Sequence, residues 1–366
     1  MRKVIADLIG SAPELDVIGF ARDSREAVEM AERLQPDVIT LDVEMPGKSG
    51  VDALPEILAA APDAAVIMIS SHTQERADIT LAALERGAVD FFPKPDRNQL
   101  SQLRESRDIL VAKIIAVGQS RQPRRRAREA RHGPGSALES TSPPRPRRRE
   151  PKPTESGLDF PVFATATAAL HTIVIGISTG GPQALGKVLP LIPASSPPIL
   201  IVQHMPATFT AVFAERLNRA CSQLSVKEAE DGDKVIAGRI LIAPGGRHME
   251  VRGAPPNARV VLTDGPPVSS HRPSIDVLFK SAAKALGANA VGLIMTGMGR
   301  DGVEGCKEIL TQGGLTFGQD ETSSVVYGMN KLAFLEGTLR GQFALDQFPQ
   351  LIKRFCSDKR ANQDTV

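Results

Sequence analysis

Apolar and polar positions in the first hundred residues follow two alternating periods. Short apolar runs, typical of buried strands, occur at four places: Leu15–Phe20, Asp37–Leu41, Ala65–Ile69 and Val89–Phe92. The segments between them carry apolar residues at helical spacing: Ser24–Leu34, Val51–Ala60 and Glu75–Arg86. Strands that alternate with helices indicate βαβ units and therefore a parallel sheet.

The same alternation returns over residues 169–358. The predicted strands there are His171–Ile175, Pro198–Val202, Arg239–Ile242, Arg259–Leu262, Ala290–Met295 and Leu315–Phe317. Several of them are apolar at every position, as expected for strands that are covered by helices on both faces. We therefore expect a second, larger α/β domain with a doubly wound parallel sheet.

Between residues 121 and 153 the pattern stops. Ten arginines lie there among prolines, serines and glycines, and few apolar residues are present. Such a segment cannot bury enough apolar surface to offset the entropy lost on ordering, so we predict a disordered, self-repelling linker. A basic tail for nucleic acid or an anionic membrane is the alternative. The expected parts are an α/β domain over residues 1–98, a helix end and linker over 99–168, a second α/β domain over 169–358 and a polar tail over 359–366.

Composition narrows the function classes. The net charge is +2, tryptophan is absent and Tyr327 is the single tyrosine, so stacking platforms for nucleic acid are poorly supported. Cys221, Cys306 and Cys356 lie far apart without metal-ligand spacing, which is typical of free thiols in a reducing compartment. There is no signal-peptide pattern and no apolar run of about 18 residues. We expect a cytoplasmic protein without membrane insertion.

Three polar residues follow strands of the first domain. Asp42 ends one strand, Ser70 ends the next, and Lys94 follows the last. Ligand sites of open parallel sheets lie at the carboxyl ends of strands, so the three side chains should converge. An aspartate can attack a phosphoryl donor, while a hydroxyl and an ammonium group stabilise the phosphoryl oxygens.

In these residues the first domain resembles a response-regulator receiver, which has a flavodoxin-like fold. The resemblance implies that Asp42 is the phosphoacceptor, Ser70 the switch hydroxyl, Lys94 the phosphate-contacting lysine and Phe91 the switch aromatic. It also implies that a sensor histidine kinase of chemotaxis is the phosphodonor and that Mg²⁺ is needed for phosphorylation.

The chain departs from the receiver pattern at its start. Receivers begin with a strand that ends in a pair of acidic residues holding Mg²⁺, whereas Met1–Ile5 already has the pattern of the following helix. Asp7 lies in that helix and is a poor substitute for the pair. We therefore expect a receiver without its first strand and its acidic pair, and weak or absent phosphorylation of the chain as written, because phosphoryl transfer depends on the charge of the metal.

The second domain has a serine where a nucleophile would lie. The strand Ile173–Ile175 runs into Gly-Ile-Ser-Thr-Gly-Gly-Pro, which places Ser178 in a Gly-x-Ser-x-Gly turn before a helix. Glycines relieve crowding there and let backbone N–H groups reach a developing oxyanion, and the helix N-terminus adds a partial positive charge. A phosphate-binding or merely capping turn is the alternative.

A serine needs a base, and the base needs an orienting acid. His204 follows the buried strand Pro198–Val202, and Asp301 follows Ala290–Met295, so both should lie at the same sheet edge as Ser178. His248 or His271 could be the base instead. The orienting acid would then be one of three loop residues: Asp231, Asp233 and Asp264.

Those three acids follow no strong strand, so we favour Ser178–His204–Asp301. We expect the other polar side chains near these strand ends to contact substrate. These substrate-site candidates are Arg247, His248 and Arg272.

A rival interpretation rests on Gly297–Gly302. This segment reads G-x-G-x-x-G between a strand and a helix, with Asp320 and Glu321 about twenty residues later, which is the dinucleotide fingerprint. It would indicate a nucleotide-binding oxidoreductase. Against it, the segment follows the fifth strand of the domain, and it accounts for neither Ser178 nor His204.

Five motifs occur in order in the second domain: Gly-Ile-Ser-Thr-Gly-Gly, Gln-His-Met-Pro, Ala-Pro-Gly-Gly-Arg-His-Met, His-Arg-Pro-Ser-Ile-Asp and Thr-Gly-Met-Gly-Arg-Asp-Gly. Together they resemble the Rossmann-like catalytic domain of the chemotaxis response regulator protein-glutamate methylesterases, which also act as protein-glutamine glutaminases. The resemblance covers residues 171–355, and the receiver is the same family's regulatory domain.

The resemblance implies a cofactor-free serine hydrolase that acts on methyl-accepting chemotaxis receptors in sensory adaptation. Ser178, His204 and Asp301 would carry the triad, and the N–H groups around Thr179 and Gly180, joined by the Met298 loop, would bind the oxyanion. The unphosphorylated receiver would cover the active-site edge. A non-catalytic regulatory protein is a further alternative, against which the three triad residues argue together.

Overall fold

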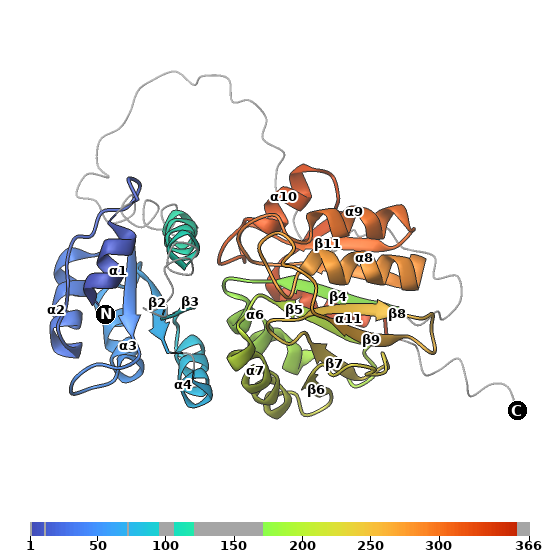
Figure 1. Ribbon diagram of the computed structural model, residues 1–366, viewed down its shortest axis with the longest axis horizontal. Coiled ribbons are helices and arrows are strands. Elements are labelled where there is room, and N and C mark those ends of the chain that lie inside the picture. Colours follow the sequence, from blue (N-terminus) through green and yellow to red (C-terminus); the bar gives the residue numbers. More distant parts are fainter. Residues whose placement is uncertain (1, 11, 72, 95–105, 121–170, 357–366) are drawn as a thin grey trace, which may run out of the picture.

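The computed structural model describes residues 2–10, 12–71, 73–94, 106–120 and 171–356. These residues form two α/β units that lie side by side in Figure 1, one coloured blue to cyan and the other green to red. Each unit is built on a parallel sheet, which confirms the predicted fold class. The expected linker over 121–153 and the tail over 359–366 lie outside the described residues.

The N-terminal unit holds a parallel sheet in the order β1-β2-β3. Its central strand β2 is buried at every position because helices cover both of its faces. A further helix spans residues 106–120. The elements are α1 (Arg2–Ile9), α2 (Ser24–Leu34), β1 (Val38–Asp42), α3 (Gly50–Ala60), β2 (Ala65–Ser70), α4 (Gln74–Glu85) and β3 (Asp90–Pro93).

The prediction of a strand at Leu15–Phe20 was wrong. The described residues of that segment form no strand, and the side chains of Ile18 and Phe20 are 49% and 55% exposed. The segment pairs with no strand of the described sheet, so its backbone gains no ladder of hydrogen bonds and its apolar side chains stay partly exposed. Its apolar pattern alone could not show this.

The C-terminal unit has a seven-stranded parallel sheet in the order β12-β11-β10-β4-β5-β7-β6. Its strands are β4 (Thr172–Ile177), β5 (Ile199–Gln203), β6 (Ser225–Glu228), β7 (Arg239–Ile242), β8 (His248–Arg252), β9 (Arg259–Thr263), β10 (Ala290–Ile294), β11 (Leu315–Gln319) and β12 (Gly341–Phe343). Its α-helices are α6 (Gly181–Val188), α7 (Ala207–Ala220), α8 (Ile275–Leu286), α9 (Val303–Thr311), α10 (Met329–Leu335) and α11 (Phe348–Lys353).

Helices cover both faces of this sheet. Side chains of α6, α7 and α11 pack on one face, and those of α8, α9 and α10 pack on the other. Alternate residues of β4 divide between the faces: Ile173 and Ile175 point to the first, and Val174 points to the second. This double covering explains why the central strands are apolar throughout.

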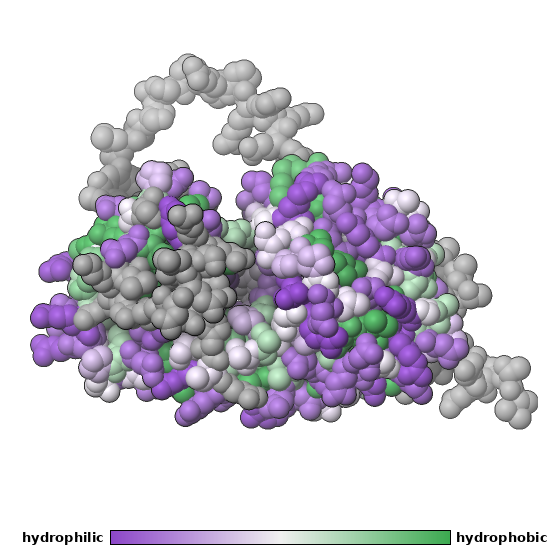
Figure 2. All heavy atoms as spheres, in the orientation of Figure 1, coloured by the Kyte–Doolittle hydropathy of each residue, from purple (hydrophilic) through white to green (hydrophobic). Residues whose placement is uncertain are grey.

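One predicted strand belongs to a different sheet. Arg259–Leu262 corresponds to β9, which pairs antiparallel with β8 in a hairpin on the α8 face. The strands β6, β8 and β12 were not predicted, because they are short or partly exposed. The face shown in Figure 2 is mainly hydrophilic over this unit, with an apolar patch over α10, where Phe334 and Leu335 are exposed. Among the described residues, no helix is both long and apolar enough to cross a membrane.

Candidate active site

Ser178 lies on the turn between the end of β4 at Ile177 and the start of α6 at Gly181. Ser178 is buried, with 8% of its surface exposed, and its N–H donates to Thr296 O at 3.0 Å. The turn needs Gly180, which has φ +79° and lies so close to Val325 that a Cβ would be 2.6 Å from it. The sequence therefore places a hydroxyl at a sharp strand-to-helix turn, where a nucleophile is accessible to substrate.

Backbone N–H groups near Ser178 are available for an anion. Gly181 N donates to Ser178 O at 2.8 Å, whereas within the described residues the N–H groups of Thr179, Gly180 and Met298 donate to no protein acceptor. The loop that carries Met298 lies against Ser178, because a Cβ on Gly297 would come within 2.8 Å of Ser178 Cβ. Donors without a partner in the resting enzyme are what a developing oxyanion requires.

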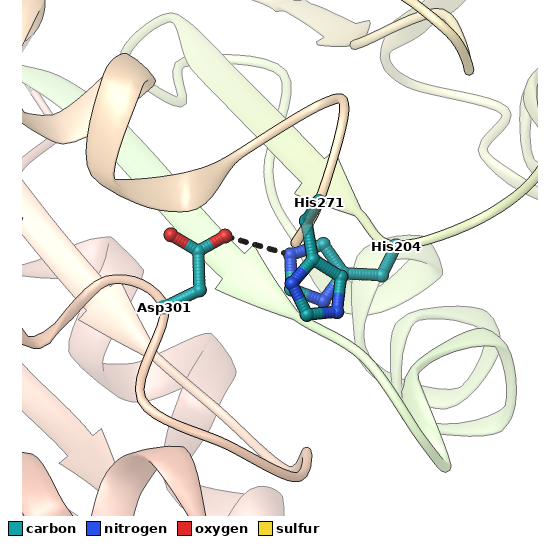
Figure 3. A group of neighbouring side chains, drawn as sticks. All are labelled: His204, His271 and Asp301. Atoms are coloured by element: carbon teal, nitrogen blue, oxygen red, sulfur yellow. Dashed lines mark hydrogen bonds and ion pairs between the residues drawn. The ribbon is translucent and has the colours of Figure 1, made fainter. Parts of the chain in front are cut away.

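His204 follows β5 and is tied to the Ser178 turn by its N–H, which donates to Ile177 O at 3.1 Å. Its Nε2 lies 2.9 Å from Asp301 Oδ2 (Figure 3). Because a carboxylate accepts, Nε2 carries the hydrogen and Nδ1 has the lone pair. Nδ1 is buried and has no hydrogen-bond partner. No hydrogen bond joins the side chains of Ser178 and His204 among the described residues, although the His204 backbone is bonded to Ile177, the residue before Ser178.

Asp301 is 1% exposed. It precedes α9 in the chain, but its carboxylate contacts the N-terminus of α8 in space. Its Oδ1 accepts from Ser274 Oγ at 2.7 Å and from Asp276 N at 3.0 Å, and its Oδ2 accepts from Ile275 N at 2.7 Å as well as from His204. Burial opposes ionisation of this carboxyl. The hydrogen bond and charge of His204, with the two backbone donors, outweigh burial and hold the pKa of Asp301 below its ordinary value.

Asp301 and Asp276 form a reciprocal arrangement between two helices. Asp301 precedes α9 and accepts hydrogen bonds from the first turn of α8, while Asp276 in that turn accepts from Gly305 N in the first turn of α9 at 2.7 Å. Negative charge is favourable at a helix N-terminus. The first turn of α8 thus fixes Asp301, the first turn of α9 fixes Asp276, and the Asp301 carboxylate is held in one orientation.

The ring of His271 stacks on His204, with centroids 3.7 Å apart and planes 14° apart (Figure 3). Its Nδ1 lies 2.6 Å from Ser269 O, so Nδ1 carries the hydrogen. Burial, and then the positive charge that His204 carries when it is protonated, lower the pKa of His271 to about 4. His271 is therefore a neutral ring that covers one face of His204.

His204, His271 and Asp301 have ligand atoms within 4.8 Å of one another, which raises the question of a metal ion. A metal held by two histidines needs both imidazole lone pairs to converge on one point. Parallel stacked rings direct their in-plane lone pairs side by side instead, and both oxygens of Asp301 are already occupied. The geometry fits acid–base chemistry better than metal coordination.

The three substrate-site candidates differ in burial and in their hydrogen-bond partners. Arg247 and Arg272 lie around one loop, where Arg247 pairs with Asp264 at 2.8 Å and Arg272 donates to Gly265 O at 2.9 Å. His248 is 2% exposed and uses both ring nitrogens inside the protein, so it has no atom left for a substrate. The structure therefore does not favour the expected substrate contact for His248.

The acids weighed as alternative orienters also have other partners. Asp231 accepts from Leu262 N, Asp233 pairs with Lys227, and Asp264 pairs with Arg247. Among the described residues, none of them contacts a histidine.

The residues predicted for the receiver site also meet at one edge. Lys94 Nζ lies 2.8 Å from Asp42 Oδ1 and 3.8 Å from Glu44 Oε2. Ser70 is buried and accepts from Thr80 Oγ1 at 2.6 Å. Mg²⁺ requires a near-octahedral set of oxygens. At this edge the described residues offer Asp42 and Glu44 with the Lys94 ammonium between them, and they form no cluster of three acids. These residues do not fit a Mg²⁺ site.

The two units meet beside the Ser178 turn. Asp90 Oδ2 on β3 accepts from Thr179 Oγ1 at 2.7 Å, and Phe91 stacks on Phe209 of α7 with ring centroids 4.3 Å apart. Arg216 of α7 pairs with Asp78 at 2.6 Å and with Glu85 at 2.5 Å, both on α4. Sequence reasoning missed Asp90 and Arg216. The available signal was that Asp90 is an acidic residue inside an otherwise apolar strand.

Comparison of the chain with known proteins identifies its family. Residues 173–352 match the CheB methylesterase family, and residues 1–105 match the response regulator receiver domain. The chain is 43% identical over 353 residues to protein-glutamate methylesterase/protein-glutamine glutaminase 2 of Koribacter versatilis, which covers 96% of this chain and 92% of that protein. The chain belongs to the CheB methylesterase family. It is also 43% identical over 360 residues to the protein-glutamate methylesterase/protein-glutamine glutaminase of group 3 operon of Rhodopseudomonas palustris, covering 98% and 94%.

Among solved structures, the CheB methylesterase catalytic domain of Thermotoga maritima is 34% identical. It covers 50% of this chain and 97% of that one, with a TM-score of 0.49.

Membership of the CheB family removes the dinucleotide interpretation of Gly297–Gly302. The local geometry agrees, because the Asp301 carboxylate would repel a pyrophosphate in that loop. Asp320, the expected ribose contact, accepts instead from Ser323 N at 3.0 Å. The CheB family is one of hydrolases with a response-regulator domain, and this confirms the predicted enzyme class.

Proposed function

We propose that this chain hydrolyses glutamate γ-methyl esters, and deamidates glutamine side chains, on methyl-accepting chemotaxis receptors. The observation that carries the proposal is His204 Nδ1, a buried nitrogen without a partner in the described residues, on a ring whose other nitrogen is bonded to Asp301 and whose backbone N–H is bonded to the residue before Ser178. Buried polar atoms normally have partners, so an exception calls for a functional reason. The names of the relatives supply the substrate class.

Acylation follows from this geometry. His204 Nδ1 takes the Ser178 hydroxyl proton as Oγ attacks the ester carbonyl carbon, and the C=O π electrons move onto oxygen. The N–H groups of Thr179, Gly180 and Met298 stabilise that oxyanion. In many serine hydrolases the other ring nitrogen faces the nucleophile; the chemistry requires only that one nitrogen binds the acid while the other accepts the proton.

Deacylation completes the cycle. The tetrahedral intermediate expels methoxide, which takes the proton from His204 and leaves as methanol. A water molecule then gives a proton to Nδ1 and attacks the acyl-enzyme, and His204 returns that proton to Ser178 Oγ as the carboxylic acid is released. The acid then loses its own proton to bulk water. With a glutamine substrate, ammonia leaves in place of methanol. Asp301 holds the ring and stabilises the imidazolium throughout. No step requires a cofactor.

We propose that the receiver restrains this site when it is docked as described. The contact between Asp90 and Thr179 fixes the turn that carries the nucleophile, and the Phe91–Phe209 stack holds the receiver strand β3 against α7. Phosphorylation at Asp42 by a sensor histidine kinase would act through the same strand, which continues into Lys94. Because the described residues do not fit Mg²⁺, we assign no step to the metal and expect persistent restraint rather than constitutive activity.

We propose that the enzyme is cytoplasmic. All three cysteines are free, which supports a reducing compartment and therefore the cytoplasm. We propose no nucleic-acid role, because the aromatic residues that stack on bases are scarce in this chain.

The test is methanol release from methylated receptor membranes by the wild-type chain and by Ser178→Ala, each checked for folding. We expect release by the wild type, raised by a variant that weakens the interface, such as Arg216→Ala, and none above background by Ser178→Ala. Equal release by the wild type and Ser178→Ala would contradict the proposal.

A further inference from the structure

Two buried residues of the sequence motifs have no part in the chemistry described above. Ser274 and His248 lie in His-Arg-Pro-Ser-Ile-Asp and Ala-Pro-Gly-Gly-Arg-His-Met, and they are 0% and 2% exposed. Substrate does not reach them. They are nevertheless joined to the active site by hydrogen bonds, so their role has to act through other residues.

Ser274 contacts the orienting acid through its side chain, as His204 does. Its Oγ donates to Asp301 Oδ1 at 2.7 Å, whereas the donors from Ile275 and Asp276 are backbone groups. A carboxylate can rotate about its Cβ–Cγ bond, and a donor fixed on Oδ1 leaves Oδ2 directed at His204. Together with the backbone donors of Ile275 and Asp276, the hydroxyl therefore fixes the orientation in which the carboxylate meets the catalytic ring.

His248 in turn fixes Ser274. The N–H of Ser274 donates to His248 Nδ1 at 3.2 Å, and His248 Nε2 donates to Pro266 O at 2.9 Å. These two bonds define one neutral tautomer, with the lone pair on Nδ1 and the hydrogen on Nε2. The neighbouring bond from Gly246 N to Arg272 O at 3.0 Å joins the turn before His248 to the segment before α8.

We propose that Ser274 and His248 are positioning residues of the triad. The chain of hydrogen bonds runs from Pro266 O through His248, Ser274 and Asp301 to His204, and it connects the β8 hairpin to the general base. The inference rests on the proposed Ser178–His204–Asp301 chemistry. Residues that hydrogen-bond to the ligands of a metal site commonly change activity by factors of about ten to a hundred, and we expect a similar scale for this triad.

The first experiment compares Ser274→Ala with Ser274→Thr in the full chain. Alanine removes the hydroxyl and threonine keeps it, so we expect kcat to fall about tenfold in Ser274→Ala with KM unchanged, and to return most of the way in Ser274→Thr. Ser196→Ala is the matched control, because Ser196 is a buried serine before β5, at the opposite edge of the sheet, and its Oγ bonds to Pro197 O and to no other group among the described residues. We expect its kcat to match the wild type.

The second experiment separates the two bonds of His248. His248→Asn places an acceptor near the Nδ1 position, and His248→Gln places a donor near the Nε2 position. Each variant loses one bond, so a purely structural role would lower activity equally in both. Positioning through Ser274 predicts that His248→Asn keeps more kcat than His248→Gln.

Every variant is also assayed by the rate at which a small fluorophosphonate labels Ser178. Labelling reports activation of the nucleophile without a receptor substrate, so it distinguishes this inference from the proposed function. Labelling without methanol release would count against the substrate and leave the positioning roles testable. The inference is overturned if folded Ser274→Ala labels and turns over at the wild-type rate, if Ser274→Thr is as impaired as Ser274→Ala, or if the two His248 variants are equal.

Discussion

Thr179, the residue after the proposed nucleophile, donates a hydrogen bond of 2.7 Å to Asp90 of the receiver unit. Asp90 is buried and also pairs with Lys113, so its carboxylate is held from both sides. Thr179 O accepts from Thr296 Oγ1 at 2.9 Å. A residue whose N–H is proposed for the oxyanion hole is therefore fixed at its side chain by one unit and at its carbonyl by the other.

Release of the receiver should raise basal activity. Arg216→Ala removes four hydrogen bonds to Asp78 and Glu85, and we expect methanol release to rise several-fold because the receiver leaves the site more often. The gain should be modest, since partly exposed ion pairs stabilise weakly. Initial rates at equal enzyme concentration measure it. Arg219→Ala, an exposed arginine on the same helix, is the matched control, and an equal gain there would show that the effect is not due to the interface.

Loss of the orienting charge should affect turnover far more than binding. Asp301→Asn keeps the shape of the side chain but removes the carboxylate that fixes the Nε2–H tautomer of His204. By analogy with the aspartate of other triads, kcat should fall about 10⁴-fold. Single-turnover methanol release, with Ser178→Ala as the zero reference, gives the value. A fall of less than tenfold in a folded protein would remove Asp301 from the triad.

The buried ring of His271 should make the protein less stable in acid. Its pKa is lowered to about 4 in the folded protein, against 6.5 as the ordinary value, so the unfolded chain binds this proton more readily. Stability is therefore lost as pH falls from about 6.5 to about 4. The single-site ceiling is about 3 kcal/mol, and partial exposure to water makes the actual loss smaller.

The measurement is the difference in unfolding free energy between pH 7 and pH 4.5 for wild type and for His271→Phe, which keeps a ring against His204. The wild type should lose more stability than the variant over this range. Equal losses would mean that His271 is not held neutral.

The sequence was sufficient to predict the position of a residue that directly follows a buried strand. Ser178, His204 and Asp301 each follow a buried parallel strand, and the rule that such strand ends share an edge brings them together without further information. The helix Ser24–Leu34 was also predicted with the bounds that the structure shows, because Asp23 caps it and Gln35 ends it.

The sequence was not sufficient where the position of a residue depends on a different part of the chain. His248 looked accessible because it follows a strand, yet Pro266 and Ser274 enclose it. Leu15–Phe20 has the apolar pattern of a strand, but strand formation needs pairing with a neighbour, and the segment pairs with no strand of the described sheet. The contact between Asp90 and Thr179 joins residues that are 89 positions apart, and no local pattern encodes it.

Phosphorylation of Asp42 in this 366-residue chain should be weak. Lys94 occupies the space between Asp42 and Glu44, and the described residues provide no acidic cluster to hold Mg²⁺ against the incoming phosphoryl group. Incubation with a small phosphodonor and Mg²⁺, followed by intact-mass measurement, should show little added phosphate, and methanol release should change little.

The control is Asp42→Asn, which should be indistinguishable from the wild type in both measurements. Stoichiometric phosphate on the wild-type chain and none on Asp42→Asn would show that the metal is held by groups other than those at this edge.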